Sequence, residues 1–166
     1  MVTATLQTTL SLGEWAVSNN ADAVLTCLGL GSCVAFIAYD PIAHVGGMAH
    51  TVLPDSAQGR PSPRSEAKFV DVAVPLVLRE MMALGAHQTR LHVSLVGGAS
   101  MLAGGRVQDS MNIGARNAIA ARAATEALGL RVRLEDTGGT QGRTVHLLVR
   151  TGEVTIATAR VLRAAA

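Results

Sequence analysis

The sequence predicts an α+β fold in which mixed β-sheets are layered with two long helices. Short apolar stretches bounded by glycine, proline and asparagine recur along the chain, as they do in β-rich proteins. Two longer stretches, 65–84 and 112–128, repeat apolar residues every three or four positions and predict helices. At 166 residues, with 49% hydrophobic residues, the chain is long enough to fold as one domain, 1–166, around a sizeable core.

The strand-like stretches lie on both sides of the first predicted helix and are separated by turn signals. Asp40-Pro41 is expected to turn the chain between two neighbouring strands, and Thr151 to Glu153 to close a hairpin near the C-terminus. The expected strands are 1–11 (an edge strand), 13–18, 23–27, 33–39, 45–53, 90–96, 131–135, 144–149 and 154–159.

Each predicted helix has recognisable ends. Ser65 is the expected N-cap of the first helix, Gly85 its terminator, and Pro75 the place of a kink. Asn112 is the expected cap of the second, alanine-rich helix, and Gly129 ends it. The apolar stripe expected to bury the first helix consists of Phe69, Val72, Ala73, Leu76, Val77, Met81 and Leu84.

Composition excludes several classes of function. The formal net charge is +2, from 14 basic and 12 acidic residues, which is too balanced for electrostatic binding of nucleic acid or a membrane surface. The aromatic fraction of 2% argues against a platform for stacking bases. The longest apolar run, 28–39, is interrupted by two glycines and a serine and is shorter than the roughly 20 residues of a membrane span. We therefore expect neither a nucleic-acid partner nor membrane insertion.

The chain has only two cysteines, Cys27 and Cys33, whereas a secreted disulfide scaffold would use more. Its N-terminus lacks a basic segment followed by an apolar core, so no signal peptide is evident. These observations predict a cytoplasmic protein with reduced thiols.

Cys33 and His50 are the candidate catalytic pair. Cys33 follows a glycine turn at the start of an apolar strand, and His50 lies 17 residues later, near the end of the next strand. A hairpin of that span brings thiol and imidazole side by side, the minimum for a thiol nucleophile. The backbone N–H groups of Ser32 and Cys33, at the turn, are the candidate oxyanion donors and are expected to lower the pKa of the thiol.

Two further interpretations of this region stay open. The proline-rich stretch 54–64 is either a plain connector or a flap beside the site. Cys27, Cys33, His44 and His50 fall within 24 residues and suggest zinc, but each pair has five intervening residues instead of the usual two to four. We predict neither a metal nor a cofactor.

Five separated blocks resemble the chemoreceptor glutamine deamidase family, CheD: LGLGSCVAFIAYDP, GGMAHTVLP, VGGASM, GARNA and EDTGGTQGRTVHLLVRTGEV. The resemblance implies a single deamidase-like domain folded like the cytotoxic necrotizing factor deamidases. It implies a bacterial chemotaxis enzyme that hydrolyses glutamine side chains on the cytoplasmic helices of chemoreceptors to glutamate, releasing ammonia. The nucleophile and histidine of the family correspond to Cys33 and His50. Some members bind the phosphatase CheC, and some are reported to act on receptor methyl esters. The block containing Asn117 is expected to be framework.

One departure concerns the third catalytic residue. The family has a threonine six positions before the cysteine, where this chain has Cys27, with Thr26 one step earlier. Neighbouring side chains on a strand face opposite ways, so Thr26 serves only if a bulge shifts the register. Otherwise Cys27 or a backbone carbonyl takes the role. The departure also favours an alternative function, a catalytically weakened interaction protein that binds receptors or a phosphatase.

Overall fold

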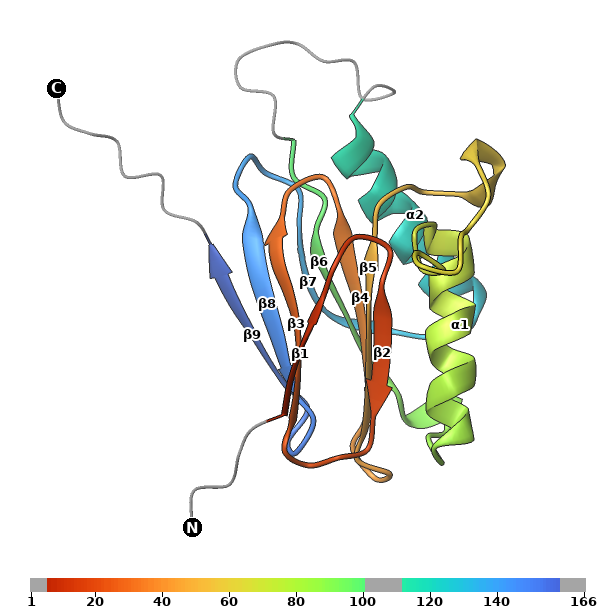
Figure 1. Ribbon diagram of the computed structural model, residues 1–166, viewed down its shortest axis with the longest axis vertical. Helices are drawn as coiled ribbons and strands as arrows, with labels where there is room; N and C mark the ends of the chain where they lie inside the picture. Colours follow the sequence, from red (N-terminus) through yellow and green to blue (C-terminus); the bar gives the residue numbers. More distant parts are fainter. Residues whose placement is uncertain (1–5, 101–111, 159–166) are drawn as a thin grey trace, which may run out of the picture.

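The computed structural model describes residues 6–100 and 112–158, which form three layers (Figure 1). A four-stranded sheet packs on a five-stranded sheet, and two α-helices cover the far side of the latter. The strands are β1 (Leu6–Leu10), β2 (Trp15–Ser18), β3 (Ala23–Leu30), β4 (Val34–Asp40), β5 (Val45–Thr51), β6 (His92–Gly97), β7 (Val132–Thr137), β8 (Arg143–Leu148) and β9 (Glu153–Thr158). The helices are α1 (Val70–Ala83) and α2 (Ile113–Ala127), with 3₁₀ turns at Ser56–Gln58 and Gln88–Arg90.

The expected strands are present, but the chain distributes them between two sheets. The four-stranded sheet has the order β1-β3-β8-β9 and the five-stranded sheet the order β2-β5-β4-β6-β7. The pairs β1/β3 and β6/β7 are parallel and the others antiparallel, which makes both sheets mixed. β1 is an edge strand, as expected. Positions 1–5 and 159 of the expected strands lie outside the described residues.

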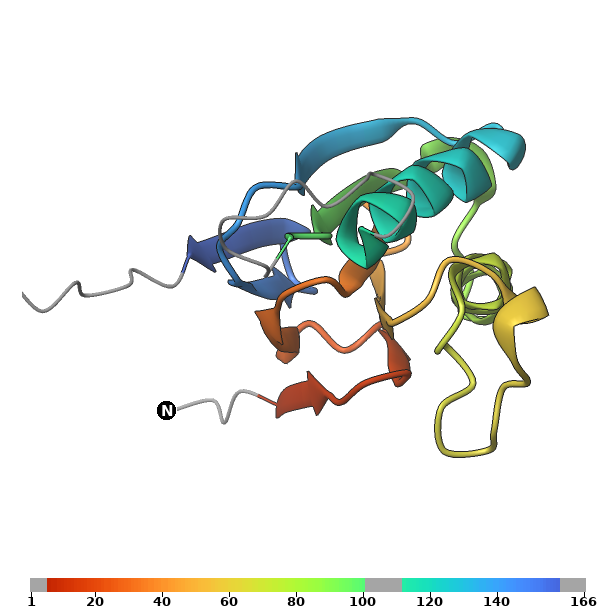
Figure 2. The ribbon, with the colours of Figure 1, turned by 90° about the horizontal axis from the view of Figure 1, so that it is seen from above.

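Two apolar clusters hold the layers together. One, between the sheets, includes Leu25, Ile37, Met48 and Leu147. The other, between the five-stranded sheet and the helices, includes Phe36 and residues of both helices; Figure 2 shows both helices on that side. Every residue of β4 and β5 is buried, because both faces of these central strands are covered. This explains why β4 is a nearly continuous apolar run.

The start of α1 differs from the sequence prediction. The helix begins at Val70, and its N-cap is Phe69, which makes no side-chain capping bond. Ser65 instead bonds Ser62 through its hydroxyl, while Phe69 forms a parallel bridge with Leu53. The bridge holds Phe69 in an extended conformation, so the helix cannot start earlier.

The buried face of α1 is also rotated from the predicted stripe. Val72 and Leu76 are only partly buried and Leu84 is 42% exposed, so their predicted burial was wrong. Apolar residues on several sides of this helix make its periodicity ambiguous, and packing on the sheet decided the face. The buried residues are Val70, Ala73, Val74, Val77, Leu78 and Met81.

The other predicted ends are confirmed. Gly85 follows the C-cap of α1 in a left-handed conformation, with φ of 95°. The Asn112 side chain caps α2 by accepting a hydrogen bond from the Ala115 N–H at 3.1 Å, and Gly129 follows the end of that helix. Within the described part of the chain, neither helix is long and apolar enough to cross a bilayer.

Candidate active site

The register of the β4–β5 hairpin places Cys33 and His50 on one face of the five-stranded sheet. Ala35 is directly opposite His50, and Cys33 precedes Ala35 by two residues. Cys33 lies one residue before β4 begins, and continuing the alternation of side chains places it on the Ala35 face as a diagonal neighbour of His50. Such neighbours lie about 7–8 Å apart, within reach of long side chains. Cys33 packs against the cluster between the two sheets, so both side chains face the four-stranded sheet.

Three hydrogen bonds hold His50 to the end of β1 and to the segment that connects β1 with β2. Its backbone N–H donates to the Glu14 carbonyl at 2.9 Å, and its carbonyl accepts from the Gly13 N–H at 2.9 Å. Its Nδ1 lies 3.1 Å from the Leu10 carbonyl oxygen. Since a carbonyl only accepts, Nδ1 carries the proton and Nε2 remains free as an acceptor. The imidazole is therefore oriented as a base.

The Cys33 backbone is fixed by the turn that follows β6. The Gly98 N–H donates to the Cys33 carbonyl at 2.8 Å. Gly97 has a φ of 118°, and a Cβ at that position would lie 2.2 Å from the same carbonyl oxygen. Only glycine permits this close approach. The thiol itself is partly exposed.

Burial sets the resting protonation of the pair. It raises the pKa of the Cys33 thiol above its ordinary value of 9.0. Burial also lowers the pKa of His50 below 6.5, against the smaller opposing effects of the Leu10 carbonyl and Glu14. The expected lowering of the thiol pKa was wrong, because desolvation is the dominant effect here. At neutral pH both groups are uncharged, so the thiol proton has to move to the imidazole when the sulfur attacks.

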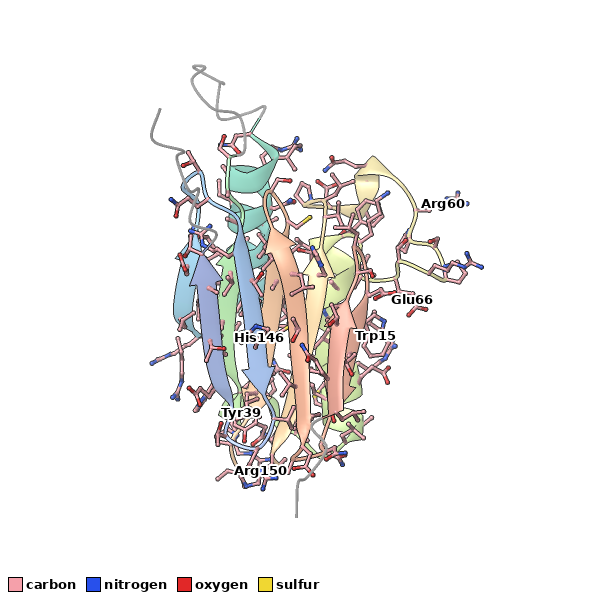
Figure 3. The ribbon with its side chains drawn as sticks, turned by 60° about the vertical axis from the view of Figure 1, so that its left-hand side comes forward. Trp15, Tyr39, Arg60, Glu66, His146 and Arg150 are labelled. Atoms are coloured by element: carbon pink, nitrogen blue, oxygen red, sulfur yellow. The ribbon has the colours of Figure 1, made fainter. Side chains whose placement is uncertain are left out.

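The Thr26 side chain makes its hydrogen bond on the face of β3 that points away from His50. Its Oγ1 lies 2.8 Å from Nδ1 of His146, a β8 residue that Figure 3 labels. The neighbours Val145 and Leu147 point into the core between the sheets, which places the Thr26–His146 pair on the outer face. The register of β3 does shift, but between Cys27 and Leu30, beyond Thr26. The hydroxyl therefore does not reach His50.

Cys27 faces the inside of the sandwich. It is fully buried, and its Sγ lies 3.5 Å from the sulfur of Met48. Burial, with a smaller effect of Cys33, raises the pKa of its thiol to about 12. Of the three possibilities for orienting His50, the contact in the structure is the one with a backbone carbonyl, that of Leu10.

His44 lies at the other end of the hairpin. It occupies the turn between Asp40 and Val45 with a φ of 52°, and its Nδ1 lies 3.0 Å from the Tyr39 hydroxyl. The four-residue zinc set considered from the sequence is thus not brought together. Within residues 6–100 and 112–158, no group of three or more His, Cys, Asp or Glu side chains is placed to hold a metal ion.

A pocket of about 380 Å³ lies beside the segment that holds His50. Its walls include Leu10, Glu14 and Trp15 on one side and Arg64 and Glu66 on the other. The Trp15 indole N–H donates to the Glu66 carboxylate at 3.0 Å, and the two side chains adjoin in Figure 3. The proline-rich loop 54–64 thus ends in the wall of a pocket next to the candidate site.

An α+β sandwich with a cysteine just before one strand and a neutral histidine on the adjoining strand defines the class, a candidate thiol hydrolase. Residues 52–158 match the family described as CheD chemotactic sensory transduction; this match begins just after His50. A probable chemoreceptor glutamine deamidase CheD of Symbiobacterium thermophilum is 42% identical over 149 residues, 90% of each chain. The chemoreceptor glutamine deamidase CheD of Thermotoga maritima is 40% identical over 147 residues, 89% of this chain and 88% of that protein. This chain belongs to the CheD family.

Two contributors were not identified from the sequence. The Leu10 carbonyl left no signal, because every residue has one. Asn117 belongs to the block expected to be framework, but the structure places its side-chain amide against the carbonyl of Ser32, next to Cys33. The sequence alone does not show that this amide is buried; the packing of α2 on the sheet decides it.

Proposed function

We propose that this chain is a protein-glutamine deamidase of chemotaxis. It acts in the cytoplasm, as a single deamidase-like domain over 1–166, on glutamine side chains of chemoreceptor cytoplasmic helices. Membership of the CheD family supports the reaction. The observation that carries the mechanism is the register of Ala35 opposite His50, which gives thiol and imidazole a common face.

The mechanism uses the resting neutral pair. His50 Nε2 accepts the Cys33 thiol proton as the sulfur attacks the carboxamide carbon, while the Leu10 carbonyl holds the proton on Nδ1. The backbone N–H groups at Ser32 and Cys33 donate to the oxyanion, with each good donor contributing roughly 3–4 kcal/mol. The imidazolium then protonates the departing ammonia and leaves a thioester. His50 activates a water that hydrolyses it to glutamate and free thiol.

The Cys27 position supports an alternative. At position 27, where the family has a threonine, this chain has a fully buried cysteine whose thiol has a raised pKa. A chain weakened in catalysis would act as an interaction protein that binds receptor helices or a CheC-type phosphatase.

One experiment separates the two functions. The purified protein is incubated with a chemoreceptor cytoplasmic fragment, and the fragment is digested and analysed by mass spectrometry for glutamine-to-glutamate conversion. We expect conversion by the wild type and none by Cys33→Ala. Binding of the fragment without conversion supports the interaction protein, and conversion by Cys33→Ala contradicts the thiol mechanism.

A further inference from the structure

The side-chain amide of Asn117 joins the two strands of the candidate site. Asn117 lies on α2 and is fully buried. Its Nδ2 donates to the Ser32 carbonyl at 2.9 Å and to the Val52 carbonyl at 2.9 Å. Both partners are acceptors, so the NH₂ group has to face them. Ser32 directly precedes Cys33 and Val52 follows His50 by two residues, so one group ties the thiol segment to the imidazole strand.

The bond to Ser32 also sets the direction of a neighbouring donor. The Ser32 carbonyl and the Cys33 N–H belong to the same planar peptide, in which they point in opposite directions. With the carbonyl bound to Asn117, the Cys33 N–H points away from α2. Within residues 6–100 and 112–158, the hydrogen bonds of the structure leave this N–H without an acceptor. A fixed donor beside the sulfur, with no acceptor among the described residues, is what a developing oxyanion requires.

Holding the Asn117 amide in this orientation costs stability at its oxygen atom. Among the described residues, Asn117 Oδ1 is a buried side-chain acceptor with no hydrogen-bond partner. Such an atom loses its hydration without compensation. A buried framework position would be better filled by an apolar side chain, which would carry no such penalty. The two donated bonds are the feature that an apolar residue lacks.

The helix is placed so that the amide reaches the carbonyls. Gly114 lies one turn before Asn117 on the same helix face. A Cβ at Gly114 would lie 2.4 Å from the Ala99 carbonyl and 2.6 Å from that of Gly98. The absence of a side chain there lets α2 pack directly on the turn that holds Cys33.

We propose that Asn117 is a positioning residue of the deamidation reaction, which orients the Ser32–Cys33 peptide so that the Cys33 N–H donates to the oxyanion. This inference rests on the proposed function. It predicts that loss of the amide impairs the step that forms an oxyanion and spares a reaction of the same thiol that forms none.

The test compares deamidation of a chemoreceptor fragment with alkylation of Cys33 by iodoacetamide. Asn117→Ala should lower kcat about 10- to 100-fold, part of the effect of losing an oxyanion donor, with KM unchanged. Its alkylation rate should stay within about twofold of the wild type, because that displacement has no oxyanion. Thr125→Val is the matched control: Thr125 is fully buried on the same helix, and among the described residues its hydroxyl bonds only the Ala121 carbonyl. It should leave both rates unchanged.

A second variant adds a pH signature. Asn117→Asp keeps the shape of the side chain and loses the donors when ionised, whereas the protonated carboxyl regains one. Its kcat relative to the wild type should therefore rise as the pH falls. If Asn117→Ala does not fold, as judged by circular dichroism, Asn117→Asp and Asn117→Ser replace it in the comparison.

Three outcomes would overturn the inference. A kcat of Asn117→Ala equal to that of the wild type would show that Asn117 has no positioning role. An equal fall in deamidation and alkylation would mean a merely structural effect. A wild type that converts no glutamine but still alkylates at Cys33 would reject the proposed function itself, and the inference with it.

Discussion

The two ends of the β4–β5 hairpin differ in how completely their polar groups are paired. At the turn, the buried Asp40 carboxylate accepts from the N–H groups of Ile42 and Ala43 and from that of His87. Arg90 adds Nε and Nη2 bonds to it at 2.8–3.1 Å. These bonds outweigh the cost of burial and hold the pKa of Asp40 well below its ordinary value.

The open end of the same hairpin has an incomplete set of bonds. The Asn117 Oδ1 has no partner among the described residues, and Gly97 adopts a φ of 118° against the Cys33 carbonyl. Burial opposes ionisation of both Cys33 and His50. Buried polar groups without partners often mark the places where chemistry occurs. The turn end therefore supplies stability and the open end supplies reactivity, within one pair of strands.

The largest effect that tests this difference is on the rate. His50→Gln keeps a polar side chain at the open end but removes the base, and we expect kcat to fall by about 10²- to 10⁴-fold. The control is His87→Gln at the turn end, an exposed histidine that should leave kcat unchanged. Initial rates of glutamine conversion measure both variants. Comparable losses in the two would contradict the division of roles.

The second-largest expected effect is a loss of stability caused by a substitution at the turn end. Asp40→Asn removes the charge opposite Arg90, and because Arg90 is 36% exposed and partly screened, we expect the free energy of unfolding to fall by about 2–4 kcal/mol. Well below the unfolding temperature, kcat should stay near the wild-type value. Denaturant unfolding gives the measurement.

The stability lost in Asp40→Asn should depend on pH, and Glu80→Gln serves as its control. The pKa of Asp40 is lowered on folding, so the carboxylate stabilises the fold above its ordinary pKa of 3.8, and this contribution disappears as the pH falls through the lowered value. The difference in the free energy of unfolding between Asp40→Asn and the wild type should therefore shrink in acid. Glu80→Gln, in the exposed Arg79–Glu80 pair, should change stability by less than about 0.5 kcal/mol.

The pH profile tests the neutral pair at the open end. Activity requires neutral His50, whose pKa is lowered, so the acid limb of kcat/KM should fall below pH 6.5. Activity also requires the thiol proton for the departing ammonia, and the pKa of Cys33 is raised, so the alkaline limb should lie above pH 9.0. An alkaline limb well below pH 9.0 would instead indicate a preformed thiolate–imidazolium pair, which is lost when the imidazolium gives up its proton.

The smallest effect concerns Thr26. Because its hydroxyl bonds His146 on the outer face, Thr26→Val should change kcat by less than about twofold and cost about 1 kcal/mol of stability for the lost hydrogen bond. Rates and denaturant unfolding of this variant give both values. A large loss of kcat would mean that Thr26 reaches His50 during the reaction, against the register of β3.

Local features of the fold were predictable because their causes are local. The Asp40-Pro41 turn, the Gly85 and Gly129 helix ends and the Asn112 cap each depend on a few adjacent residues, and the structure contains all of them. The start of α1 was not predictable, since the bridge between Phe69 and Leu53 decides it. For the same reason the buried face of that helix depends on the sheet beneath it.

The sequence by itself determined the α+β class, the hairpin and the two residues whose chemistry suits a thiol hydrolase, since alternation, turn residues and side-chain type are written in the chain. Only the tertiary structure decided which groups surround that pair. The division of strands between two sheets brings the Leu10 carbonyl to His50, and the packing of α2 brings Asn117 to Ser32, 85 residues away in sequence. Backbone carbonyls look alike in every sequence, so the partner of each becomes apparent only when the layers have packed.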